Sequence, residues 1–151
     1  MPPFIATTAL LTGKIDAAAL PEHYATLAES MSAKVLVRSQ NLWSAMPGSG
    51  VVATEEFLKK HRDIVVRIVR ILTKATKYMK DHPDEAARIV AKYLASDVGI
   101  ISKSMPYLDY LTHINVREIQ QYINYLVKYG VLRRNLSASE FIDLSILGGK
   151  S

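Results

Sequence analysis

The sequence predicts an α/β fold in which a strand, helix and strand near the start are followed by a mainly helical region. Two short apolar runs flank a helical pattern within the first 40 residues. After residue 54 the apolar residues recur at intervals of three and four, which is the spacing of helices. A chain of 151 residues with 49% hydrophobic and 22% charged residues also has a globular composition.

The first 40 residues are expected to form a helix, a strand, a helix and a strand. Residues 4–12 have a helical pattern that Gly13 ends. Residues 15–20 are rich in alanine, which favours helix, but their short length between a glycine and a proline favours a buried strand. A helix follows over residues 22–32, and residues 33–39 form the second strand. Strand, helix and strand with tight connections make a βαβ unit with parallel pairing.

The chain then passes through a loop and becomes helical. Residues 40–50 form a loop that carries the single Trp, and residues 51–54 form a short strand. Thr54 is expected to cap a helix that has acids in its first turn. The apolar stripe of this helical stretch consists of Leu58, Val65, Ile68, Val69, Leu72, Ala75 and Met79.

Further helical segments complete the chain. Pro83 opens a helix of about three turns, and residues 96–106 form a short one. Asn115 and Glu118 form a capping-box pair for a helix that Gly130 ends. The same kind of pair recurs near residue 140 and predicts a last short helix.

Composition excludes several classes of site. The chain has no Cys, which excludes disulfides, thiolate catalysis, Cys-ligated zinc and a lipidated N-terminal Cys. Its four His have no ligand spacing on a common helical face, so we expect no metal site and no cofactor. The most apolar later stretch is interrupted by Arg67 and Arg70, far short of the roughly 20 residues that cross a membrane.

Two side-chain stripes are candidates for an interaction surface. The net charge of +5 suits an anionic partner only if the charge lies on one face. We expect the basic stripe to be a solvated outer face, because no aromatic residues alternate with it, and we therefore expect no nucleic-acid partner. The alternative is a helical interaction module that binds nucleic acid through this face. The basic stripe is Lys60, Arg67, Arg70, Lys74 and Lys77, and the tyrosine stripe, expected to be a core edge or contact surface, is Tyr122, Tyr125 and Tyr129.

Polar residues gather directly after the first predicted strand. Ligands of open α/β sheets lie beyond the carboxyl ends of the strands, so these residues occupy the place where a small molecule would bind. Three residues after the second predicted strand would lie beside them. The alternative is that Glu22 only complements a helix N-terminus and that His23 is exposed. The predicted ligand-binding residues are Pro21, Glu22, His23, Tyr24, Asn41, Trp43 and Ser44, and no catalytic residue is predicted.

Three stretches resemble a known family. They are "ALLTGKIDAAALPEHYATLAE", then "VLVRS", then "GVVATEEFLKKHRDIVVRIVRILTKATKYMKDHPDEAARIVAKYL". Their order and spacing are similar to the second half of extracytoplasmic solute-binding proteins of ABC transporters, in the branch for nitrate, aliphatic sulfonates, taurine and thiamin-pyrimidine precursors. The resemblance implies a periplasmic-binding-protein type II-like fold, in which two lobes close on a ligand like a hinge.

The resemblance also implies a domain division and partners. Residues 1–40 would belong to lobe two, residues 41–50 to a crossover or hinge loop, and residues 51–151 to the C-terminal strand and helices of lobe one. The partners would be a small-molecule solute and the permease of the ABC transporter. The family's N-terminal half has no counterpart in this sequence. We therefore expect a C-terminal fragment that self-associates or pairs with a complementing N-terminal half.

The leading hypothesis is a non-enzymatic solute-binding component of an ABC importer for a small anionic or zwitterionic solute. Glu22 suits an amine or hydroxyl, and His23, which stands where the family usually has a proline, adds a titratable donor. An enzyme like the thiamin-pyrimidine synthases is disfavoured, because the cysteine-rich motif associated with them cannot exist here. The family is extracytoplasmic, but no signal peptide is evident, so we expect the chain expressed as given to stay in the cytoplasm.

Overall fold

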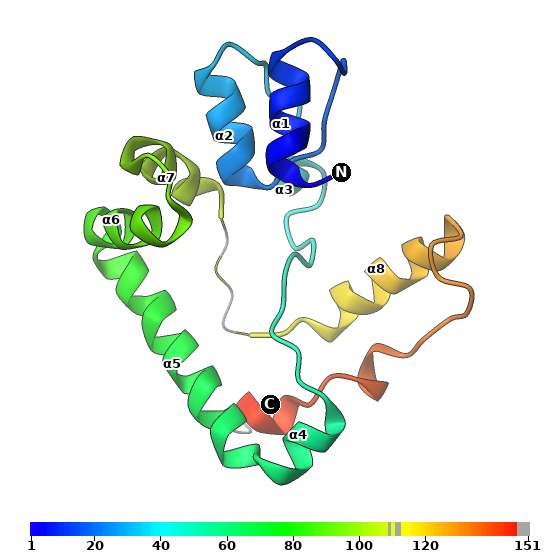
Figure 1. Ribbon diagram of the computed structural model, residues 1–151. Coiled ribbons are helices and arrows are strands. Elements are labelled where there is room, and N and C mark those ends of the chain that lie inside the picture. Colours follow the sequence, from blue (N-terminus) through cyan, green and yellow to red (C-terminus); the bar gives the residue numbers. More distant parts are fainter. Residues whose placement is uncertain (109, 111–112, 148–151) are drawn as a thin grey trace. The chain divides into compact units, whose positions relative to one another are not determined.

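The computed structural model describes residues 1–108, 110 and 113–147, and the regular elements within these ranges are α-helices and short 3-10 helices (Figure 1). The chain divides into two compact units. The first unit holds Met1–Leu36 and Thr76–Tyr110, and the second holds Val37–Ala75 and Leu111–Ser151. Helix α5 (Arg62–Asp81) begins in the second unit and ends in the first. Each unit is therefore built from two separate stretches of chain.

In the first unit, each helix packs against at least one other helix. Helix α1 contacts α2, α2 contacts α7, and α7 contacts both α6 and the 3-10 helix η1. The core cluster is Ala87, Ala91 and Ile101, against which Val90 and Met105 pack. Two alanines leave room for α6 and α7 to approach closely, so this core is tight but small. The elements are α1 (Pro3–Leu11), α2 (Glu22–Ser30), α6 (Pro83–Leu94), α7 (Val98–Ser104) and η1 (Met105–Tyr107).

In the second unit, side-chain bonds join distant stretches of chain. Ile123 and Ala138 are among its buried residues. The backbone N–H of Ala138 donates to Gln120 Oε1 at 2.8 Å, which fastens the chain after α8 back onto that helix. Arg62 pairs with Asp143 at 3.1 Å. The elements are α3 (Ser39–Leu42), α4 (Glu55–Lys60), most of α5, α8 (Val116–Lys128), η2 (Ala138–Glu140) and η3 (Leu144–Leu147).

Several helix ends lie where the capping residues predict them. Gly13 and Gly130 follow α1 and α8 with φ of +68° and +71°, a region that favours glycine. Thr54 Oγ1 accepts the backbone N–H of Phe57 at 3.2 Å and so caps α4. The side chain of Asn115 accepts two backbone N–H groups in the first turn of α8. These predicted helix ends are confirmed. They could be predicted from the sequence because each depends on residues only a few positions apart.

The three predicted strands are wrong. Residues 15–20, 33–38 and 51–54 have no regular secondary structure, and residue 39 begins helix α3. A strand needs a neighbour that completes its backbone ladder, and none of the described segments supplies one. The predicted βαβ unit is therefore not formed, although its central helix is present as α2. The helical stretch after Thr54 is also divided, because His61, with φ of −136°, separates α4 from α5.

Candidate functional site

Four of the predicted ligand residues lie at the start of helix α2, in the first unit. Pro21 precedes the helix with φ of −56°, and its carbonyl accepts hydrogen bonds from the backbone N–H groups of Tyr24 at 2.9 Å and Ala25 at 3.0 Å. Glu22 is the first helical residue, where the positive end of the helix dipole stabilises a carboxylate. Pro21 thus sets the start of α2 and places Glu22, His23 and Tyr24 in its first turn.

The side chains of this turn are partly buried and already make contacts. Thr26, which is 4% exposed, donates through Oγ1 to Glu22 Oε1 at 3.1 Å. The rings of His23 and Tyr24 lie with centroids 4.2 Å apart. Burial lowers the pKa of His23 from 6.5, so the imidazole is neutral at neutral pH. A neutral imidazole has one donor and one acceptor, which suits a polar solute.

The other three predicted ligand residues lie in and after helix α3, in the second unit. Asn41 Oδ1 accepts the backbone N–H of Arg38 at 3.3 Å, so this oxygen helps to fix the start of α3. The amide NH₂ is then the part of Asn41 that can donate to a solute. Ser44 follows in the turn after α3, and both Asn41 and Ser44 are exposed. The structure fixes each group of predicted residues within its own unit.

Trp43 is held against helix α8. Its Nε1 donates to Glu118 Oε2 at 2.5 Å. The indole ring centroid lies 6.2 Å from that of Tyr122 and 5.8 Å from that of Tyr125, and the second pair has the edge-to-face geometry that aromatic rings favour. Because the indole N–H already has an acceptor, the ring face is the part of Trp43 that can meet a solute.

The sequence prediction missed Glu118 as a partner of Trp43. The capping-box pattern assigns Glu118 to the N-terminus of α8, and Asn115 does cap that helix, but the Glu118 carboxylate accepts a hydrogen bond from Trp43. The two residues are 75 positions apart, so no helical spacing or short motif indicates their contact. The tyrosine stripe did carry part of the signal, since Tyr122 and Tyr125 form a contact surface for Trp43.

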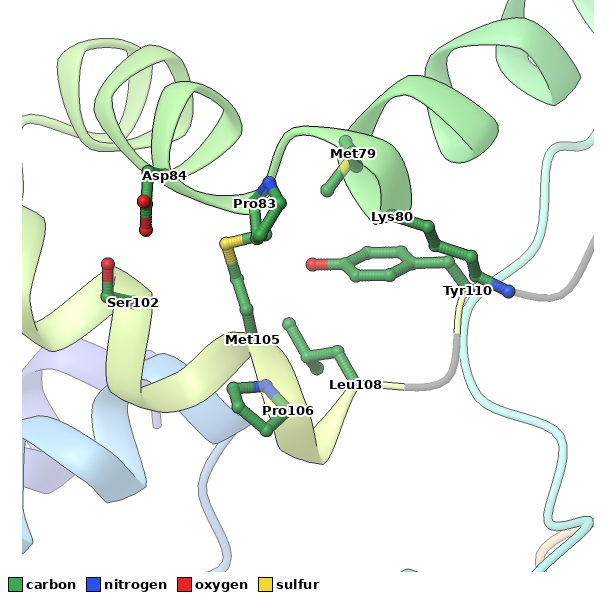
Figure 2. Close-up of a pocket in the computed structure, with 9 residues that line it drawn as sticks. All are labelled: Met79, Lys80, Pro83, Asp84, Ser102, Met105, Pro106, Leu108 and Tyr110. Atoms are coloured by element: carbon green, nitrogen blue, oxygen red, sulfur yellow. The ribbon is translucent and has the colours of Figure 1, made fainter.

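A cavity of about 300 Å³ in the first unit also escaped prediction (Figure 2). It lies between the end of α5, the start of α6 and the chain after α7, and none of the predicted ligand residues lines it. Tyr110 points its hydroxyl into the cavity, and burial raises the pKa of that hydroxyl. Met79, Pro83 and Met105 give it apolar walls. No group of His, Asp or Glu within the described ranges has the arrangement of a metal site.

Comparison with known proteins decides the family. The model of the NMT1-like family matches residues 1–95, which is more than half of the chain. The chain belongs to the NMT1-like family. The matched segment contains all seven predicted ligand residues, from α2 and from α3 with the turn after it. The family resemblance seen in the sequence is thereby confirmed.

A relative in Bacillus subtilis supports the same assignment. Its description is "putative aliphatic sulfonates-binding protein", and it is 32% identical to the NMT1-like chain over 111 residues. This alignment covers 72% of the chain and 33% of the relative, so the chain spans about a third of the length of the protein it matches. No solved structure matches the chain. None of the helices that the structure describes is both long and apolar enough to span a bilayer.

Proposed function

We propose that the chain is part of the solute-binding component of an ABC importer and that its solute is a small anion or zwitterion of the nitrate, sulfonate or taurine kind. One observation carries this proposal: the family match covers the segment that holds all seven predicted ligand residues. The description of the Bacillus subtilis relative as an aliphatic sulfonate-binding protein supports the solute class. Binding without chemical conversion is the activity proposed.

In the first unit, the start of α2 supplies groups for both ends of a zwitterion. The Glu22 carboxylate attracts an ammonium group, and its bond from Thr26 holds one oxygen in place. His23 is neutral, so it can donate an N–H to a sulfonate or carboxylate while presenting an acceptor on its other nitrogen. A zwitterion such as taurine therefore matches this turn better than a simple anion, which Glu22 would repel.

In the second unit, the proposed contacts come from Asn41, Trp43 and Ser44. The Asn41 amide and the Ser44 hydroxyl are exposed donors. Trp43 contributes its ring face, because Glu118 accepts its N–H. A solute with a short alkyl chain between its charged groups would gain apolar contact with that ring.

The proposed organisation follows the two-lobed arrangement of solute receptors. Residues 1–40 belong to lobe two, residues 41–50 form the crossover, and residues 51–151 belong to lobe one. The solute, the transporter permease and either a second copy or a complementing N-terminal half are the proposed partners, and the proposed location is extracytoplasmic, as for the family. Exposed apolar residues support the need for a partner chain: Leu36 is 79% exposed and Val52 is 92% exposed.

Calorimetric titration and thermal shift test the proposed solute class. Taurine, methanesulfonate, nitrate, bicarbonate and the thiamin pyrimidine would be added to the chain alone and to the chain joined to the unmatched part of the Bacillus subtilis relative. We expect taurine to bind and His23→Ala to weaken that binding by roughly tenfold, because one hydrogen bond to a charged group is lost. The exposed His113→Ala is the matched control. Absence of any solute response in both forms would contradict the proposal.

A further inference from the structure

The cavity beside Tyr110 is built within the first unit alone. Its lining residues come from the end of α5, the start of α6, and α7 with the chain after it, and all of them lie in Thr76–Tyr110. One wall is Met105, which packs against the core cluster of this unit. Leu108 follows in a turn in which its backbone N–H donates to the Met105 carbonyl at 3.1 Å. The core of the first unit therefore holds this wall in place.

The hydroxyl of Tyr110 is a hydrogen-bonding group without a partner in the described fold. It points into the cavity (Figure 2), and it forms no hydrogen bond with another residue that the structure describes. Burial raises the pKa of the Tyr110 phenol above its usual value of 10.0, so the hydroxyl keeps its proton and can donate at neutral pH. Because an unpaired polar group that is partly buried costs free energy, a bound molecule that accepts this hydrogen bond would stabilise the unit.

The walls near that hydroxyl suit an aromatic ligand. Met79 and Met105 line the cavity, and so does the ring of Tyr110. Thioether sulfur and aromatic rings both make favourable contacts with a further ring. The volume of about 300 Å³ is roughly twice that of an apolar cavity of about 150 Å³ that holds benzene in another protein. A fused two-ring molecule therefore has a suitable size and surface.

The charged side chains that line the cavity are directed away from the Tyr110 hydroxyl. In Figure 2 the Lys80 ammonium points away from it, and the Asp84 carboxylate points toward Ser102. A charged group placed at the Tyr110 hydroxyl would lose water without gaining a counter-ion, which costs free energy. The ligand group that faces Tyr110 is therefore a neutral acceptor.

We propose that this cavity binds a small neutral aromatic molecule, a fused two-ring compound with a ring nitrogen or carbonyl oxygen that accepts the Tyr110 hydrogen bond. The site is separate from the proposed solute site, because none of the seven predicted ligand residues lines it. The competing occupant is an apolar side chain from the part of the Bacillus subtilis relative that the chain does not cover. Such a side chain would leave the Tyr110 hydroxyl without an acceptor, whereas the proposed ligand satisfies both the hydroxyl and the apolar walls.

NMR of the methionine methyl groups tests the site directly. Of the five Met, Met79 and Met105 line the cavity, while Met1, Met31 and Met46 do not. The full chain, labelled with carbon-13 at these methyl groups, would be titrated with quinoline, whose ring nitrogen accepts a hydrogen bond, and with naphthalene, which has the same shape and no acceptor. We expect quinoline to bind with roughly millimolar affinity and its ring current to shift only the two cavity signals.

A conservative substitution tests the hydrogen bond. Tyr110→Phe removes the hydroxyl and keeps the ring, so we expect it to weaken quinoline binding by about fivefold and to leave naphthalene binding unchanged. Tyr93→Phe is the matched control, because Tyr93 is 84% exposed on α6 and does not line the cavity.

Three results would overturn the proposal. Neither compound could shift the Met79 and Met105 signals at millimolar concentration. Tyr110→Phe could bind quinoline as tightly as the unchanged chain does, which would show that the hydroxyl makes no contact with the ligand. Quinoline could bind the chain alone but not the chain joined to the unmatched part of the Bacillus subtilis relative, which would show that this part fills the cavity.

Discussion

At the scale of single residues, Trp43 and Glu118 form the contact with the clearest consequence. The indole N–H to carboxylate distance of 2.5 Å joins α8 to the chain just after α3. Hydrogen bonds to charged groups contribute more than those between neutral groups. This bond therefore holds the indole ring in place, and with it the aromatic contacts of Trp43 with Tyr122 and Tyr125.

Glu118→Ala is expected to lower the free energy of unfolding by about 1–3 kcal/mol, because Trp43 loses its acceptor. The emission of Trp43 should shift to longer wavelength as the indole becomes more hydrated. Urea unfolding followed by tryptophan fluorescence measures both effects, since the chain contains one Trp. Glu140→Ala, at an exposed position in η2, is the control. Equal stability of Glu118→Ala and the unchanged chain would contradict this role.

His23 should make the stability of the first unit depend on pH. Burial lowers the pKa of His23 in the folded chain, whereas the unfolded chain has a pKa near 6.5. Between these two values the unfolded state binds more protons, so stability falls as pH drops through 6.5 toward the folded pKa. This loss of stability is absent well above pH 6.5 and complete well below the pKa of His23 in the folded chain.

Proton NMR of the His23 ring checks the pKa directly, and thermal unfolding at about pH 8 and about pH 5 checks its effect. We expect His23→Gln to reduce the decrease in melting temperature on acidification. The corresponding change at the exposed His113 should leave the decrease unaltered. A His23 pKa at or above 6.5 would show that burial does not control it.

At the scale of single elements, the ends of helices depend on a few local residues. Gly130 follows α8 with φ of +71°, and a Cβ added there would meet no other atom within 4 Å. Gly130→Ala therefore tests backbone strain without steric clash, and we expect a loss of about 1–2 kcal/mol in the free energy of unfolding. Gly50→Ala, also in open space but without positive φ, should stabilise by about 0.4–1 kcal/mol by restricting the unfolded chain. Urea unfolding followed by circular dichroism distinguishes the two, and equal effects of the two substitutions would contradict the strain argument.

The same locality explains which elements could be predicted from the sequence. Thr54, Asn115 and Gly130 act on neighbours within a few positions, so their patterns identified helix ends correctly. The predicted strands failed because a strand depends on a distant partner that no local pattern supplies. Alanine at residues 17–19 and β-branched residues in 33–39 indicated burial in a sheet, but burial requires a neighbour as well as a suitable side chain.

The candidate site shows the same division. The turn that begins with Pro21 was predictable, because proline, acid and helix start lie side by side in the sequence. The Glu118 contact and the cavity beside Tyr110 depend on chain stretches brought together only by folding. The partial burial of His23 could not be predicted from residue spacing either. The sequence analysis therefore kept an exposed His23 as an alternative.

At the scale of the whole molecule, the buried residues are small. Alanine accounts for most of the buried apolar positions among the described residues, while Leu36, Val52 and Tyr93 are each more than three-quarters exposed. Each alanine buries little apolar area, so the contribution of this core to folding is modest. Exposed side chains of this size favour association with another chain.

Multi-angle light scattering checks the association that we propose. At micromolar concentration we expect a mass above the 16.8 kDa of one chain. Val52→Lys, which places a charge at a position that is 92% exposed, should shift the mass toward that of one chain. Lys92→Arg keeps both charge and location and serves as control. A folded species of 16.8 kDa that persists at this concentration would contradict self-association.

The single Trp gives the two units different optical signals. Trp43 belongs to the second unit, whereas the first unit, which has tyrosines such as Tyr24, Tyr78 and Tyr93, has no Trp. Tryptophan emission therefore follows the melting of the second unit alone, while far-ultraviolet circular dichroism averages over all helices. Coincident transitions would mean that α5, which both units share, makes them one cooperative folding unit. Separate transitions would assign a distinct stability to each.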